Sequence, residues 1–86
     1  MREVHLSQRA EKYQQKLDAH LQKRIMNKIC LLAKTPVPSN AKTVGRNKQG
    51  EQIYRIRIGD YRVLYVLKET CVLIAKIDKR PRVYDR

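Results

Sequence analysis

The chain has 86 residues, with 20 lysines and arginines against 8 aspartates and glutamates, so its formal net charge is +12 at neutral pH. A chain of this length has room for one hydrophobic core, and we expect a single domain over residues 1–86. So large a charge repels itself and favours a polyanionic partner: nucleic acid, an anionic membrane or an acidic protein.

The sequence gives no sign of a membrane protein, a secreted protein, a metal or cofactor site, or a catalytic histidine pair. No apolar run approaches the roughly 20 residues that a membrane helix needs. The N-terminal residues 1–4 lack an apolar signal-peptide core, so we expect a cytoplasmic protein that inserts into no membrane. Cys30 and Cys71 lie in different predicted elements and are expected to be small buried hydrophobes. His5 and His20 do not suggest a catalytic pair. No motif predicts a bound metal or a small-molecule cofactor.

The first half of the chain has the pattern of two helices. A short extended segment is expected at 3–6. Ser7 and Asp18 are then placed to cap helices over 8–16 and 19–34, each with apolar residues at helical spacing. Two helices joined so closely predict an antiparallel helical hairpin.

The second half alternates between apolar and polar residues, which is typical of strands. A weak strand is predicted at 41–46, and stronger strands are predicted at 53–58, 61–67 and 71–78. Together with the helices, this order predicts an α+β fold in which the N-terminal helical hairpin packs on a small, mainly antiparallel twisted sheet.

The turn at Gly59-Asp60 fixes the register of the first strong hairpin. A two-residue turn puts Ile58 opposite Tyr61 and Arg57 opposite Arg62. One face of the hairpin is then apolar and is expected to lie under the helices. Its members are Tyr54, Ile56, Ile58, Tyr61, Val63 and Tyr65.

The last strand has two possible registers. A three-residue loop over 68–70 would put Lys76 beside Arg62 and leave Leu73, Ala75 and Ile77 on the core side. A two-residue loop would place Lys76 in the core, which desolvation of its charge opposes. We therefore expect the three-residue loop.

The second face of the hairpin carries Arg55, Arg57 and Arg62. Like charges that face each other destabilise a sheet, and such a conflict is typical of a functional site. Charge alone would fit a solvated surface equally well, but further cations are expected on the same face or at its C-terminal edge. These are Lys76, Lys79, Arg80 and Arg82. The clustering predicts a surface that binds RNA phosphates, and Asp78 is expected to orient an arginine there.

Two segments resemble a known family. The sequence from Tyr54 to Tyr65, which contains Tyr-Arg-Ile-Arg-Ile-Gly-Asp-Tyr-Arg, and the tail Lys79-Arg80-Pro81-Arg82-Val83-Tyr84 are similar to the RelE/ParE superfamily of prokaryotic type II toxins. The resemblance implies a RelE-like fold and a cognate antitoxin protein as partner. For the RelE branch it also implies an endoribonuclease that works without a metal, binds the ribosome and cuts mRNA in the A site.

The resemblance also assigns roles to residues. Arg57, Arg62, Arg80 and Tyr84 correspond to catalytic positions, and Arg55 to the basic residue paired with Arg57. The clustering of cations on one predicted face, rather than the resemblance, assigns RNA binding to Arg55, Lys76, Lys79 and Arg82. Many RelE-type enzymes carry lysines where this chain has Arg55 and Arg57.

The chemistry of these side chains favours Tyr84 as the base that takes the proton of the RNA 2′-hydroxyl. Arginine, with a pKa of about 12.5–13.8, is almost never neutral near pH 7, whereas tyrosine, at about 10, ionises more readily among cations. The arginines suit the stabilisation of phosphate charge. Lys76 and Lys79 are the other candidates for proton transfer.

Two other functions stay open. A ParE-like member of the superfamily would poison DNA gyrase and have no nuclease activity. A basic RNA- or ribosome-binding module without catalysis would tolerate Tyr84→Phe with little effect. Basic residues on the helices, among them Lys12 and Lys16, could be solvated or could bind ribosomal RNA or an acidic antitoxin segment.

Overall fold

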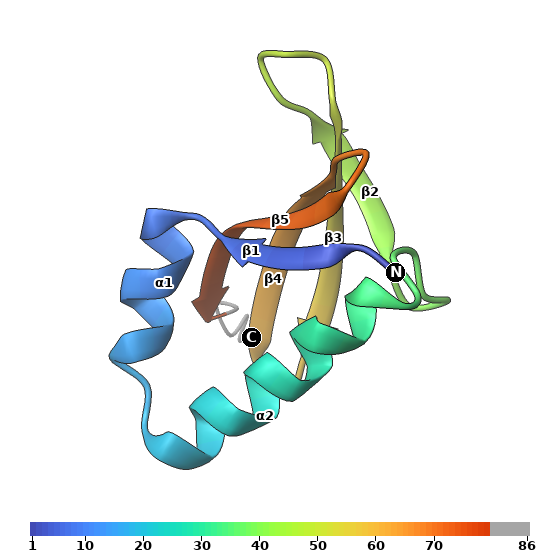
Figure 1. Ribbon diagram of the computed structural model, residues 1–86. Helices are drawn as coiled ribbons and strands as arrows, with labels where there is room; N and C mark the ends of the chain where they lie inside the picture. The colour runs from blue at the N-terminus through green and yellow to red at the C-terminus, as the bar shows by residue number, and fades with distance from the viewer. Residues whose placement is uncertain (80–86) are drawn as a thin grey trace, which may run out of the picture.

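The computed structural model describes residues 1–79 of the chain. Two helices and five strands follow one another as in Figure 1. In chain order they are β1 (Glu3–Leu6), α1 (Gln8–Gln15), α2 (Ala19–Cys30), a 3-10 turn η1 (Leu31–Ala33), β2 (Lys42–Arg46), β3 (Gln52–Ile58), β4 (Tyr61–Leu67) and β5 (Cys71–Lys79). The predicted α+β fold class is confirmed. No helix in this part of the chain has the length and apolarity to span a membrane.

Both predicted helix caps are present. The Ser7 hydroxyl accepts a hydrogen bond from the Ala10 N–H at 3.1 Å, and the Asp18 carboxylate accepts one from the Leu21 N–H at 3.0 Å. The second helix is shorter than predicted, because α2 ends at Cys30 and its last turn tightens into η1. A tightened final turn is a common helix ending, and Pro36 disfavours helical dihedrals in the residue before it.

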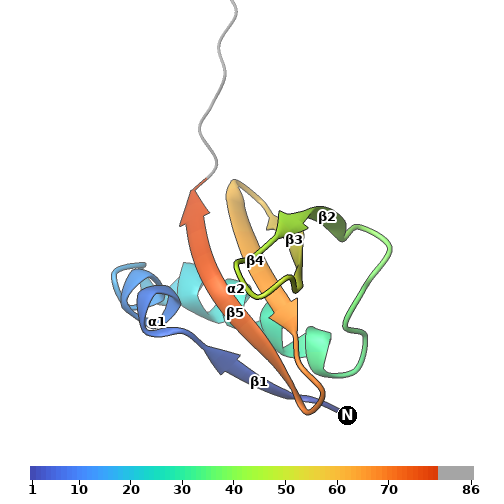
Figure 2. The same ribbon diagram turned by 90° about the horizontal axis from the view of Figure 1, so that it is seen from above.

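The strands form one sheet in the order β1-β5-β4-β3-β2, antiparallel except for the parallel pair β1 and β5. The chain leaves β1 at Ser7, whose N–H and hydroxyl donate to the carbonyls of Ile74 and Ala75, each at 2.8 Å. From there α1 runs beside the second half of β5, while α2 crosses one face of the sheet (Figures 1 and 2).

The core lies between α2 and the sheet. Ile25 and Ile29 of α2 and Leu32 of η1 pack on the face that the sequence predicts to be covered. On that face Ile56, Ile58, Val63 and Tyr65 are buried, and Tyr54 and Tyr61 pack partly buried against them. The predicted core face of the first hairpin is therefore confirmed.

Tyr65 illustrates how the core is filled without phenylalanine or tryptophan, which the chain lacks. Its ring is fully buried and stacks on Tyr54, with ring centroids 5.5 Å apart. Its hydroxyl donates to the Pro36 carbonyl at 2.7 Å, which satisfies the buried polar group. The same hydrogen bond ties residues 34–41, the proline loop between η1 and β2, to the sheet.

The register of β3 and β4 is as predicted, with Ile58 opposite Tyr61 and Arg57 opposite Arg62. The register of β5 is not. The turn has two residues, Glu69 and Thr70, closed by a hydrogen bond from the Lys68 N–H to the Cys71 carbonyl at 2.8 Å. The predicted three-residue loop is therefore wrong.

A β-bulge in β5 explains why Lys76 nevertheless stays out of the core. Pairing shifts by one residue at Ala75, so Tyr65 lies opposite Ile74 whereas Leu64 lies opposite Lys76. The extra residue reverses the alternation of faces along the strand. In consequence Lys76 does not lie directly beside Arg62 as predicted.

The core positions of β5 change for the same reason. Val72 and Ile74 are buried, whereas Leu73 and Ala75 are only half-buried and do not face the core as predicted. Beyond the bulge Ile77 is buried as predicted.

Candidate functional site

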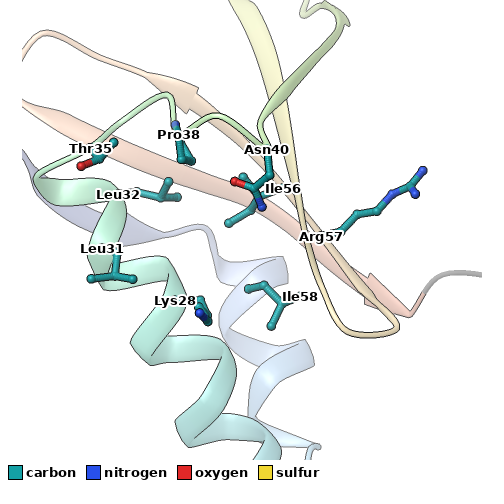
Figure 3. Close-up of a pocket in the computed structure, with 9 residues that line it drawn as sticks. All are labelled: Lys28, Leu31, Leu32, Thr35, Pro38, Asn40, Ile56, Arg57 and Ile58. Carbon is teal, nitrogen blue, oxygen red and sulfur yellow. The ribbon is translucent and has the colours of Figure 1, made fainter.

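The face of the sheet opposite the helices carries the predicted arginines, and we call it the arginine face. Arg55 and Arg57 reach it from β3 and Arg62 from β4, because they alternate with the buried residues of those strands. Arg57 is exposed, and its side chain extends away from Ile56 and Ile58, which point to the helix side (Figure 3). The structure thus brings Arg57 and Arg62 together as directly opposed partners.

Arg62 is held in place by a carboxylate. Its Nε and Nη2 atoms donate to Asp78 Oδ1 and Oδ2 at 3.0 and 3.2 Å, and Lys76 Nζ lies 3.4 Å from Oδ2. The prediction that Asp78 orients an arginine is confirmed. Lys76 and Arg62 also meet, although through Asp78 rather than as opposed residues.

This cluster fixes the charge states of its members. Hydrogen bonds from Arg62, and then its charge and Lys76, lower the pKa of Asp78, while Asp78 raises the pKa of Arg62. Because Asp78 occupies Nε and Nη2, the Nη1 hydrogens of Arg62 remain to be donated to a phosphate. The arrangement pre-orients a guanidinium for a bound anion.

Arg55 differs from Arg57, although both lie on β3. It is half-buried, opposite Leu64, and its Nε is buried without a hydrogen-bond partner among residues 1–79. A buried unpaired donor costs about 1–3 kcal/mol. Because Arg55 is half-buried and Arg57 is exposed, Arg55 is the less accessible of the two arginines.

The far end of the arginine face is apolar and charge-balanced. Ile53 faces Val66, and Val66 faces Leu73. Beside them Lys68 Nζ lies 2.6 Å from Glu51 Oε2, and this hydrogen bond, with a second from Asn47, lowers the pKa of Glu51. The excess positive charge of the face therefore begins at Arg55, which lies opposite Lys42 of β2, and continues to Arg57 and Arg62. This division is not among the predictions, although Ile53 and Val66 stand at strand positions that share a face with Arg55 and Arg62.

Lys79 is the last of the predicted cations that the structure describes. Lys79 is exposed at the end of β5, opposite Tyr61, so it lies at the C-terminal edge of the face. Arg80, Arg82 and Tyr84 lie outside the described residues, and their roles stay predictions.

Two core tyrosines are poor bases. Burial raises the pKa of Tyr65 to about 12, with Tyr54 as a smaller cause. Burial also raises the pKa of Tyr13, with Tyr61 next in importance. Both hydroxyls therefore stay protonated near neutral pH.

Residues 1–79 contain no group of three or more histidine, cysteine, aspartate or glutamate side chains that could hold a metal ion. Cys71 is half-buried and Cys30 is exposed on α2, so the prediction of two buried cysteines is wrong for Cys30. The apolar stripe of α2 passes through Ile25 and Ile29, and Cys30 is the next residue around the helix.

A small pocket on the helix side has an apolar floor. It has a volume of about 190 Å³ and lies between η1, the proline loop and the end of β3 (Figure 3). Leu31, Leu32, Ile56 and Ile58 line it, and Lys28 and Arg57 lie at its margin.

Comparison with known proteins matches almost the whole chain. The family model for the ParE toxin of type II toxin–antitoxin systems, parDE, matches residues 4–84. The Methanocaldococcus jannaschii protein named as toxin RelE1 is 33% identical over 64 residues, which cover 72% of this chain and 71% of that protein.

Solved structures share the fold. A chain of the archaeal RelE–RelB complex from Pyrococcus horikoshii superposes with a TM-score of 0.80 at 26% identity, covering 95% of this chain and 98% of its own length. The isolated Escherichia coli RelE toxin superposes with a TM-score of 0.80 at 20% identity, covering 96% of this chain and 88% of its own. The two-helix, five-strand arrangement is therefore that of RelE structures.

Proposed function

This chain belongs to the RelE/ParE superfamily of toxins of type II toxin–antitoxin systems, and we propose that it is a RelE-type endoribonuclease. In this proposal it acts in the cytoplasm, cuts messenger RNA in the ribosomal A site and needs no metal. The observation that carries the proposal is the exposed Arg57 opposite Arg62, with Arg62 pre-oriented by Asp78.

The proposed reaction uses the 2′-hydroxyl of the message. Its oxygen attacks the neighbouring phosphorus while Tyr84 takes its proton, and the bond from phosphorus to the 5′-oxygen breaks. A cationic side chain, for which Lys76 and Lys79 are the candidates, donates a proton to the departing 5′-oxygen. The phosphate that was attacked is left as a cyclic ester. Arg57, Arg62 and Arg80 stabilise the negative charge that grows on the phosphate oxygens.

RNA binding is assigned to the cations around this centre. Arg55, Lys76, Lys79 and Arg82 would hold neighbouring phosphates and so position the message. Binding of this kind weakens steeply with salt, because each contact releases counterions.

A cognate antitoxin is the proposed protein partner. The Pyrococcus horikoshii structure and a Mycobacterium tuberculosis structure are toxin–antitoxin complexes, which supports a similar partner here. The charge of the arginine face favours docking of an acidic antitoxin segment there. Undiminished antitoxin binding by an Arg57→Ala/Arg62→Ala variant would contradict this part of the proposal.

A ParE-like inhibitor of DNA gyrase is the second candidate, because the matching family model is named for the ParE toxin. A non-catalytic RNA- or ribosome-binding module is a third. The three differ in their products: a cut message, trapped or broken DNA, or intact nucleic acid.

The deciding experiment is primer extension on a message in pre-formed translating ribosomes, with EDTA added after assembly. Wild-type protein is compared with Arg80→Ala and Tyr84→Phe, because those residues complete the proposed centre. We expect cuts within A-site codons that resist EDTA and fall by about 10²-fold or more in both variants.

Other results redirect the assignment. An intact message together with inhibited supercoiling by gyrase would establish the ParE-like function. Ribosome binding without cleavage, unchanged in Tyr84→Phe, would establish the binding module.

A further inference from the structure

A second hollow, the α1–β5 cleft, lies between α1 and the second half of β5, which are neighbours in Figure 1. Its volume is about 420 Å³. The residues that line it are Arg9, Lys12 and Tyr13 from α1, Lys16 at the C-cap of α1, and Lys76, Ile77 and Asp78 from β5. Four cations thus surround the cleft, against one carboxylate.

The helix presents its cations as a set. Arg9, Lys12 and Lys16 follow the spacing i, i+3, i+7, which places them along one side of α1. Ala10 and Tyr13 pack against the core and fix the rotation of the helix. The position of α1 is also tied to β5 through Ser7, so the cations belong to a rigid element.

The three cations of the helix, Arg9, Lys12 and Lys16, are not paired with a carboxylate of residues 1–79. The one carboxylate of the cleft, Asp78, already binds Arg62 and Lys76. Like charges around one hollow repel each other, and a bound anion would relieve that repulsion.

We propose that the α1–β5 cleft is a second phosphate site, which binds a phosphodiester of an RNA strand that continues from the arginine face. This inference rests on the proposed function. The two sites are continuous because Asp78 contacts Arg62 on the arginine face at 3.0 Å and Lys76 at the cleft at 3.4 Å. Tyr13 and Ile77 also line the cleft, beside the four cations.

An acidic peptide fits this cleft less well than RNA. Extended peptides gain affinity by adding to a free strand edge. Beyond Ala75 that edge of β5 is flanked by α1 and is not free for an added strand. The cleft therefore offers charge without backbone pairing, which suits a phosphate.

The test removes three charges from the cleft and three from elsewhere. The cleft variant is Arg9→Gln/Lys12→Gln/Lys16→Gln, and the matched control is Lys23→Gln/Lys34→Gln/Lys48→Gln, whose residues are exposed and line neither hollow. Glutamine keeps a good helix propensity, so α1 should fold. Both variants and the wild type are titrated over a range of KCl.

Two probes identify the source of the phosphate. One is a labelled single-stranded RNA with 2′-O-methyl groups, which cannot be cut, and the other is ribosomes without message. We expect the cleft variant to bind at least one probe about 10–100-fold more weakly and to lower the salt slope by about 0.7, which is the contribution of one phosphate contact on a single strand. The control should lose less than about threefold.

Each outcome has a meaning. Loss on the RNA probe assigns the site to the message strand, and loss on ribosomes alone assigns it to ribosomal RNA. Equal losses in cleft and control variants overturn the inference, as does an oligoglutamate peptide that competes as well as RNA of equal charge.

Failure of the inference differs from failure of the proposed function. If the cleft variant binds and cuts like wild type while Arg57→Ala does not cut, only the second site is overturned. If the wild type neither binds either probe nor cuts a message, both are overturned.

Discussion

On the helix side of the sheet, Ile56, Val63 and Tyr65 are at most 4% exposed, whereas the same two strands carry Arg57 opposite Arg62 on the other side. Apolar contact stabilises the first face, and charge repulsion opposes the second. The helices thus cover only the face whose apolar contacts stabilise the fold. The uncovered face is free to hold an unfavourable charge arrangement that a bound anion would relieve.

The largest expected effect comes from the arginine face. Arg57→Ala should slow A-site cleavage by about 10²–10³-fold, because it removes a preorganised charge from the transition state. Thermal unfolding should change little, since Arg57 is exposed. The measurement is primer extension together with calorimetry, with Arg46→Ala on β2 as the control. A large loss of stability in Arg57→Ala would contradict the expectation that the arginine face contributes to cleavage and not to stability.

A substitution on the covered face should lower stability and leave cleavage unchanged. Ile29 is fully buried on α2, and Ile29→Ala should lower the free energy of unfolding by about 3 kcal/mol through lost burial and a cavity. Cleavage per folded molecule should stay near the wild-type value. Urea titration and cleavage at a temperature where the variant is folded would check this. A cleavage defect as deep as that of Arg57→Ala would contradict it.

Asp78 contributes both to stability and to the orientation of Arg62, and its substitution should have the smallest effect of the three. Its pKa lies below the ordinary value, so the charged carboxylate stabilises the native state above that value, and the gain is lost as the pH falls through the lowered pKa. Asp78→Asn should therefore lower stability by about 0.5–1 kcal/mol at pH 7, a size typical of partly exposed ion pairs, and by progressively less as the pH falls through the lowered pKa. It should also weaken cleavage, because Arg62 loses its fixed orientation.

The check is thermal unfolding of wild type and Asp78→Asn between pH 7 and pH 2. Two curves that stay parallel over this range would show that the Arg62–Asp78 pair does not stabilise the fold. Asn47→Ala offers a matched control, since it also removes a hydrogen bond to a carboxylate whose pKa is lowered, that of Glu51.

Much of this structure follows from local sequence. The turn at Gly59-Asp60 and the alternation around it determine the register that opposes Arg57 and Arg62, since a two-residue turn allows one pairing. The caps at Ser7 and Asp18 likewise need only neighbouring residues. The family follows from motifs in the same segments.

Only the tertiary structure decided the course of β5 and what lies beside it. At the bulge the Ala75 carbonyl accepts a hydrogen bond from Ser7, which is distant in sequence, and no local pattern predicts that Lys76 lies opposite Leu64. The α1–β5 cleft depends on the same contact, because it sets α1 along the strand. Local sequence thus determined the elements and the arginine pair, while long-range packing decided which cations meet, because cross-chain hydrogen bonds and burial set strand register where turns leave it open.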